Sequence, residues 1–163
     1  MVPEQLDLTP GAIRSLLTGL TPGQIAWKPA PDRFSIAEVL AHLAHAEHHA
    51  YATKYEQFAA EADSALEPYD TDGLAARGEY SRRDAVESLE DFEKQRLKNL
   101  ARVRGLPNRT LHHNKAGPIS LSDLLNECAY HDLGHIRQIA ELVRALKYHP
   151  NMGLYAKFYK VSP

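Results

Sequence analysis

Two histidines in the second half of the chain lie on a helical stripe of otherwise apolar residues. His131 and His135 are four positions apart, and this spacing places two helical side chains on one face, with their Cβ atoms about 5–6 Å apart. Neutral imidazoles at that separation can bind one metal ion. The other members of the stripe are Leu121, Leu124, Leu125, Cys128, Ile139, Leu142 and Leu146. We therefore interpret His131 and His135 as two ligands of a buried metal.

A second group of histidines could supply the third ligand. These residues are His42, His45, His48 and His49. A rotation of about 100° per helical residue places His42 at the flank of an apolar stripe. The same rotation turns His45 and His48 toward the polar side and places His49 one step further out than His42, and we interpret all three as part of a solvated face. The pattern favours His42 as the third ligand.

Four further residues have more than one interpretation: Glu47, Cys128, His112 and His113. Glu47 falls near the centre of an apolar stripe, where a carboxylate is costly unless it is paired. It could accept a hydrogen bond from a ligand imidazole, act as a fourth ligand or a general base, or reach water at an open end of the fold. Cys128 could bind zinc as a thiolate, but its place in the stripe favours a small core residue. His112 and His113 could border the site; exposed loop residues are the favoured interpretation.

Four amphipathic helices are expected to position these residues. Their predicted ranges are 9–20, 35–60, 81–105 and 120–148. Ser35 with Glu38, and Ser120 with Asp123, form capping boxes at two of the starts. Pro10 suits the first position of the first helix. The third helix is expected to bury Val86, Leu89, Phe92, Leu97, Leu100 and Val103.

The predicted connections determine the topology. Thr21–Phe34 is a proline-rich, turn-rich strap containing Trp27, 106–119 is a loop, and the aromatic tail 151–163 is expected to pack on the surface. The connection Glu61–Tyr80 can span about 66 Å when extended, which lets the helices on either side of it run parallel. We predict one all-α domain over residues 1–163, a four-helix bundle with a long crossover between its second and third helices.

Composition and charge exclude several classes of function. The 163 residues carry a formal net charge of −2 and no basic run, which argues against nucleic acid and anionic membranes as partners. No apolar stretch reaches the roughly 18–20 residues that span a bilayer, and we recognise no signal peptide. The single cysteine cannot form an internal disulfide and fits a cytoplasmic protein. Phosphate-binding glycine loops and G-x-S-x-G elbows are absent from the sequence.

Two segments resemble the DinB-like superfamily of metalloenzymes. They are F-S-I-A-E-V-L-A-H-L-A-H-A-E, residues 34–47, and G-P-I-S-L-S-D-L-L-N-E-C-A-Y-H-D-L-G-H-I-R-Q-I, residues 117–139. The resemblance implies a four-helix bundle in which three histidines bind a divalent metal. By position these are His42, His131 and His135. Some relatives transfer low-molecular-weight thiols such as bacillithiol or mycothiol, so a thiol is one expected small-molecule partner.

Three functional hypotheses follow. In the first, one divalent ion (zinc or nickel, with iron or manganese as alternatives) activates water or a thiol for hydrolysis or thiol transfer, because three ligands leave open coordination positions. In the second, the protein is a non-catalytic bundle that binds a structural metal or a ligand. In the third, the histidines are ordinary and the bundle acts through protein contacts. We also expect a homodimer.

Overall fold

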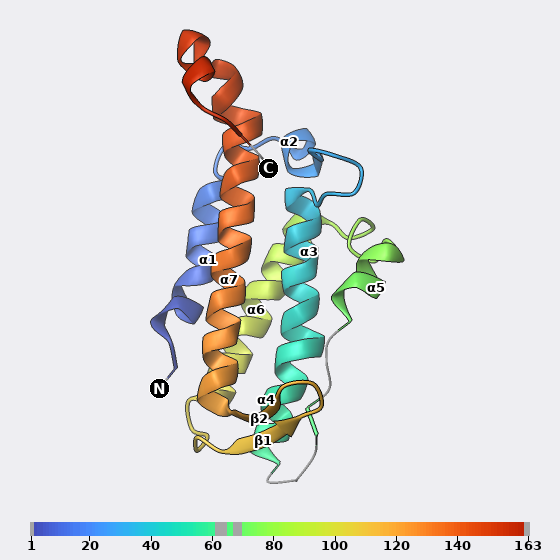
Figure 1. Ribbon diagram of the computed structural model, residues 1–163, viewed down its shortest axis with the longest axis vertical. Coiled ribbons are helices and arrows are strands. Elements are labelled where there is room, and N and C mark those ends of the chain that lie inside the picture. Colours follow the sequence, from blue (N-terminus) through green and yellow to red (C-terminus); the bar gives the residue numbers. More distant parts are fainter. Residues whose placement is uncertain (1, 61–64, 67–69, 162–163) are drawn as a thin grey trace.

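The computed structural model describes residues 2–60, 65–66 and 70–161, and its long helices form a four-helix bundle (Figure 1). The first helix is α1 and the third is α6. The second is one continuous helix, which consists of α3, the five-residue π-helical turn η1 and α4. The fourth is α7. The bounds are α1 Glu4–Leu17, α3 Ile36–Ala46, η1 Glu47–Tyr51, α4 Ala52–Ala59, α6 Ala85–Val103 and α7 Leu121–Val143. The predicted fold class is confirmed.

Shorter elements occupy the connections. A five-residue helix, α2, lies in the proline-rich strap, and α5 lies in the described part of the crossover; the residues 61–64 and 67–69 of that connection fall outside the described residues. A small hairpin closes one end of the bundle. The bounds are α2 Pro22–Ala26, α5 Thr71–Ala76, β1 Thr110–His113, β2 Gly117–Ser120, η2 Arg144–Tyr148, η3 His149–Asn151 and η4 Gly153–Phe158.

The second and third helices of the bundle run parallel, as the long crossover allows. His48 contacts Asp91, and further along both helices Arg102 contacts Glu56. The residue numbers rise together on the two helices, which is the signature of a parallel pair. α1 and α7 run in the opposite direction (Figure 1). The predicted crossover topology is thereby observed.

Helix α1 begins earlier than the sequence pattern predicted. It starts at Glu4, so Pro10 lies inside the helix rather than at its first position. A proline has no N–H to donate to the carbonyl four residues before it, which here is the carbonyl of Leu6. That oxygen instead accepts a hydrogen bond of 3.1 Å from Nη1 of Arg96. A tertiary contact therefore replaces the hydrogen bond that Pro10 cannot make.

Two other sequence predictions need correction. α6 is capped by Asp84 and not by Ser81, because the Asp84 carboxylate accepts from the N–H groups of Val86 and Glu87 at 2.8 and 3.0 Å. The segment 106–119 was predicted as a loop, but it takes part in the antiparallel hairpin β1–β2. This hairpin pairs buried Leu111 with Ile119 and covers one end of the core.

The C-terminal tail also differs from its prediction. The segment after α7 forms η2, η3 and η4, which continue beyond the end of the bundle (Figure 1). Tyr155 and Phe158 are 71% and 70% exposed there. The aromatic side chains therefore project into solvent and do not pack on the bundle surface.

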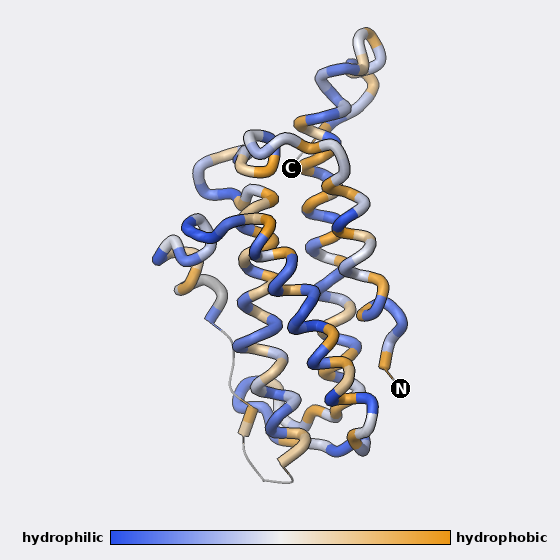
Figure 2. The backbone as a smooth tube through the Cα atoms, turned by 180° about the vertical axis from the view of Figure 1, so that it is seen from behind, coloured by the Kyte–Doolittle hydropathy of each residue, from blue (hydrophilic) through white to orange (hydrophobic). Residues whose placement is uncertain are grey.

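The core is divided into two apolar clusters by a polar layer. Along α7, one cluster ends at Ala129 and the other resumes at Ile139; along α6 they are separated between Phe92 and Leu100. Apolar and polar residues alternate along each long helix (Figure 2), the pattern of amphipathic helices packing around a core. The buried polar residues of the intervening layer are Thr9, His42, Glu47, Arg96, Asn99 and Asp132. The candidate site lies in this layer.

Candidate metal centre

Three histidine side chains converge in the polar layer. Nε2 of His131 lies 3.1 Å from Nε2 of His42 and 3.1 Å from Nε2 of His135. One ligand atom from each ring lies within 4.8 Å of the others. The four-residue spacing on α7 supplies two of the rings, and α3 presents the third from across the bundle. The structure brings together the three residues that the sequence predicted as ligands.

The far nitrogens of two of these rings are held by hydrogen bonds. Nδ1 of His135 lies 3.0 Å from Oε1 of Gln138, so this nitrogen donates and the ring presents an unprotonated Nε2 toward the other two histidines. Nδ1 of His42 lies 3.3 Å from the hydroxyl of Tyr80, at the end of the crossover. Nδ1 of His131 is buried and makes no hydrogen bond to any described residue. Two rings are thus oriented with Nε2 facing the cluster centre.

Burial keeps these imidazoles neutral. Desolvation, followed by the neighbouring His135 and His131, lowers the pKa of His42 from 6.5 to about 3. Desolvation and His135 likewise lower the pKa of His131 to about 3. Burial also lowers the pKa of His135. At neutral pH the cluster therefore offers lone pairs and carries no charge of its own, which is the state that binds a metal cation.

The donor set fits a divalent metal ion. With metal–nitrogen distances of about 2.0–2.1 Å, neighbouring ligands lie about 2.8–3.0 Å apart in octahedral coordination and about 3.3–3.4 Å apart in tetrahedral coordination. Two of the nitrogen pairs lie at 3.1 Å already. Three unprotonated nitrogens that face one another repel unless a proton or a cation lies between them. The arrangement suits an ion bound by three imidazoles, with further coordination positions left for other ligands.

A cleft of about 660 Å³ opens beside the cluster. His131 and His135 lie in its wall together with Tyr130 and Gln138. The cluster is therefore accessible from outside the bundle, on the α7 side. This volume lies within the usual range of small-molecule sites, about 300–1,000 Å³.

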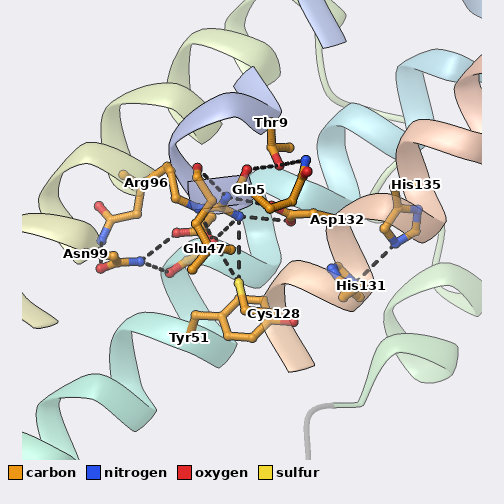
Figure 3. A network of polar contacts seen from close by, with 12 residues as sticks. Gln5, Thr9, Glu47, Tyr51, Arg96, Asn99, Cys128, His131, Asp132 and His135 are labelled. Atoms are coloured by element: carbon orange, nitrogen blue, oxygen red, sulfur yellow. Dashed lines mark hydrogen bonds and ion pairs between the residues drawn. The ribbon is translucent and has the colours of Figure 1, made fainter. Parts of the chain in front are cut away.

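A buried ionic network adjoins the histidines (Figure 3). Arg96 binds Asp132 with both terminal nitrogens, at 2.6 and 2.9 Å, and donates from Nε to Glu47 at 2.9 Å. The Asn99 amide donates to the other Glu47 oxygen at 2.7 Å. Burial alone would lower the pKa of Arg96, but the bond to Asp132 and the charge of Glu47 raise it above its usual range. With one cation and two carboxylates, the network carries a net charge of −1.

Glu47 belongs to this network and lies outside the histidine cluster. Its side chain is 1% exposed, so the interpretation that it reaches water at an open end of the bundle is wrong. Its oxygens contact Arg96 and Asn99, and none of its hydrogen bonds reaches His42, His131 or His135. Glu47 begins the π-helical turn η1, and its carbonyl accepts from both Ala52 and Asn99. Such turns are frequent at functional sites.

The remaining histidines of the continuous helix α3–η1–α4 lie away from the cluster. His49 is exposed, and its ring lies 4.2 Å from that of half-buried His45, between centroids. Nε2 of His48 contacts Asp91 at 2.9 Å. These three residues were interpreted as a solvated face, and none of them joins the group of His42, His131 and His135.

Three other sequence candidates are placed as follows. Cys128 is fully buried in the core, and this burial raises the pKa of its thiol, so it remains protonated. His112 and His113 lie on β1, at the opposite end of the bundle from α2 and the strap that contains Trp27 (Figure 1). Neither His112 nor His113 lines the cleft at His131 and His135, so these two residues do not border the candidate site.

Sequence reasoning missed several partners in the polar layer. It assigned Leu97 to the buried face of α6, whereas Leu97 is 68% exposed and Arg96 is 2% exposed. Arg96 follows Phe92 by four residues and precedes Leu100 by four, so helical spacing places it on the stripe. A charged residue on this apolar stripe was the signal from which a buried polar partner could have been predicted. Tyr80 gave no comparable signal, because it reaches His42 from an irregular connection.

Comparisons with known proteins identify the family of the chain. The sequence pattern of the DinB superfamily matches residues 5–139. The chain belongs to the DinB superfamily. No curated protein is detectably similar to the chain.

The solved structure of YfiT shares the fold over most of its length. YfiT from Bacillus subtilis, described as a probable metal-dependent hydrolase with an unusual four-helix bundle topology, superposes with a TM-score of 0.76 and 22% sequence identity. The match covers 88% of this chain and 84% of that chain. At this identity the likeness establishes the fold. Within the described part of the chain, no helix is long and apolar enough to cross a membrane.

Proposed function

We propose that this protein is a metal-dependent enzyme in which His42, His131 and His135 hold one divalent ion. The observation that carries the proposal is the convergence of three neutral imidazoles, with Nε2 pairs at 3.1 Å, next to a cleft. An ion bound there supplies a Lewis acid and lowers the pKa of a coordinated water or thiol. Zinc and nickel are the favoured metals, because imidazole ligands suit both of them; iron and manganese are the alternatives.

The chain's own groups would prepare this chemistry. Gln138 orients the ring of His135 and Tyr80 orients the ring of His42, in each case through a hydrogen bond at the Nδ1 atom of the histidine. The Arg96 network places a net charge of −1 next to the site, with Asp132 directly following His131 in the chain. A nearby negative charge favours the binding of a divalent cation by neutral ligands. The cleft at His131 and His135 would admit a small-molecule substrate from the α7 side.

Metal content should depend on the three clustered histidines. Tag-free wild-type protein is expected to bind about one divalent ion per chain, measured by elemental analysis after dialysis. His131→Ala, His135→Ala and His42→Ala should each lose most of this metal, because each removes one of three ligands. The matched control is His45→Ala, one helical turn from His42, which should retain it. Equal loss from His45→Ala, or full retention by His42→Ala, would contradict the ligand assignment.

Hydrolysis is the favoured reaction, because the structural relative YfiT is described as a probable metal-dependent hydrolase. Cobalt(II)-substituted protein should cleave ester or amide substrates without added thiol, and the metal-free protein should not. A change in the ligand-field spectrum specific to bacillithiol or mycothiol, followed by turnover with an electrophile, would instead identify a thiol transferase. A spectrum that responds to no added ligand would favour the alternative of a non-catalytic metal- or ligand-binding bundle.

A further inference from the structure

The cleft beside the histidine cluster is strongly basic. Its walls contain four cationic side chains and one carboxylate, that of Glu141. The cations are Arg33, Arg137, Arg144 and Lys160. The whole chain contains 19 Lys and Arg residues against 21 Asp and Glu residues. Four cations to one anion is therefore a local excess of positive charge, because positive and negative residues are nearly equal in number over the whole chain.

These charges come from separate parts of the chain. Arg33 precedes α3, Arg137 lies on α7, Arg144 begins η2, and Lys160 follows η4. The last two lie beyond residue 139, where the match to the DinB superfamily ends. The segment after α7 thus adds charge to a cleft whose histidines belong to the matched region.

Most of these cations have no counter-charge among the residues that the structure describes. Arg144 pairs with Glu141. Arg33, Arg137 and Lys160 form no ion pair with the residues that the structure describes. Like charges around one cleft repel each other, and an anion placed among them relieves that repulsion. Guanidinium groups bind carboxylate and phosphate alike through two parallel hydrogen bonds.

The dimensions suit an organic anion that also reaches the histidines. Arg137 is two residues beyond His135 and Arg144 is nine, which corresponds to about 3 and 13 Å along a helix axis. The cleft volume of about 660 Å³ accommodates a molecule of that length. Tyr130, 81% exposed, adds an aromatic surface to the wall. An aromatic ring favours contact with the apolar part of a ligand.

We infer that the substrate of this site is a small organic anion, whose carboxylate or phosphate is bound by Arg137 and Arg144 with Arg33 and Lys160. Its reactive bond lies at His131 and His135. This inference rests on the proposed function, because it assigns the class of substrate that the metal centre acts on. The cations bind the end of the molecule that does not react, and the metal centre receives the other end.

The test uses the metal-free full-length protein and three ligands matched in their aromatic part: phenyl phosphate, benzoate and the neutral benzyl alcohol. At low ionic strength, at least one anion should bind about tenfold or more tightly than benzyl alcohol, and added salt should weaken that binding. The preferred anion distinguishes phosphate from carboxylate. NMR or calorimetric titration measures each affinity.

Two variants locate the binding. The double variant Arg137→Gln with Arg144→Gln should lower anion affinity about tenfold or more, since two charge-assisted contacts are lost. Arg102→Gln, an exposed arginine on α6, is the matched control and should leave the affinity unchanged. No preference for either anion over benzyl alcohol, or equal loss in both variants, would overturn the inference.

Metal content separates this inference from the proposed function. The double variant should retain the metal content of the wild type, because it leaves the three histidines intact. If the wild-type protein binds anions in the cleft but no metal at the histidines, the proposed function fails while the anion site remains. If metal binds and anions do not, the inference about the substrate fails alone.

Discussion

Replacing Arg96 with methionine is expected to lower the free energy of unfolding by about 3–5 kcal/mol, because it leaves two buried carboxylates without their cation. Glu47 and Asp132 are 1% and 0% exposed, and both are bonded to Arg96. The carbonyl of Leu6, which Pro10 leaves without its helical donor, would lose its partner as well. Urea denaturation followed by circular dichroism measures the change.

The matched control is Arg102→Met on the same helix. Arg102 also pairs with a glutamate, but its side chain is 40% exposed and that of Glu56 is 62% exposed. An exposed pair contributes about 0–1 kcal/mol. Arg96→Lys, which keeps the charge but loses the two-pronged contact with Asp132, should fall between the two. Similar small losses for both methionine variants would contradict the view that the Arg96 network stabilises the polar layer.

The bundle could be predicted from sequence because each long helix carries its own signal. The capping boxes at Ser35 and Ser120 both form, and they begin α3 and α7 at the expected residues. The length of the crossover was enough to allow parallel neighbours. The start of α1 was missed because Pro10 is a strong local signal for a first helical position. A distant side chain, Arg96, satisfies the carbonyl that Pro10 leaves unpaired, and no local rule contains that information.

The three clustered histidines were found from sequence for a related reason. A histidine on an apolar stripe conflicts with its surroundings, and a conflict of that kind marks a functional site or a paired polar group. The same argument placed Glu47 near the centre of an apolar stripe, but it left open whether the carboxylate is paired in the interior or reaches water, and it could not name its partners. Arg96 and Asn99 contact Glu47, and Asp132 contacts Arg96, only after three helices have packed together. Tyr80 reaches His42 from a connection with no periodic pattern, so only the folded chain reveals it.

Acidification should destabilise the metal-free protein between about pH 6.5 and pH 3. Burial lowers the pKa of His42 and of His131 from 6.5 to about 3 in the folded state. Within this window the unfolded chain binds protons at these histidines and the folded chain does not, so stability falls as the pH falls. Each histidine contributes a slope of up to about 1.4 kcal/mol per pH unit. Above pH 6.5 both states are neutral at these rings, and this contribution to the slope disappears.

The free energy of unfolding, measured with denaturant in the presence of a chelator at several pH values, tests this expectation. His131→Gln removes one of the buried titrating groups and should make the dependence on pH shallower across the window. His112→Gln, on the exposed hairpin, is the matched control and should leave the slope unchanged. Excess divalent metal should raise stability near neutral pH, by about 2.7 kcal/mol at one hundred times its dissociation constant. That gain should persist through most of the window and be lost only near pH 3, where protons begin to displace the metal from the imidazoles of the folded chain. A wild-type stability that does not change between pH 6.5 and 3 would show that these histidines are not held neutral by burial.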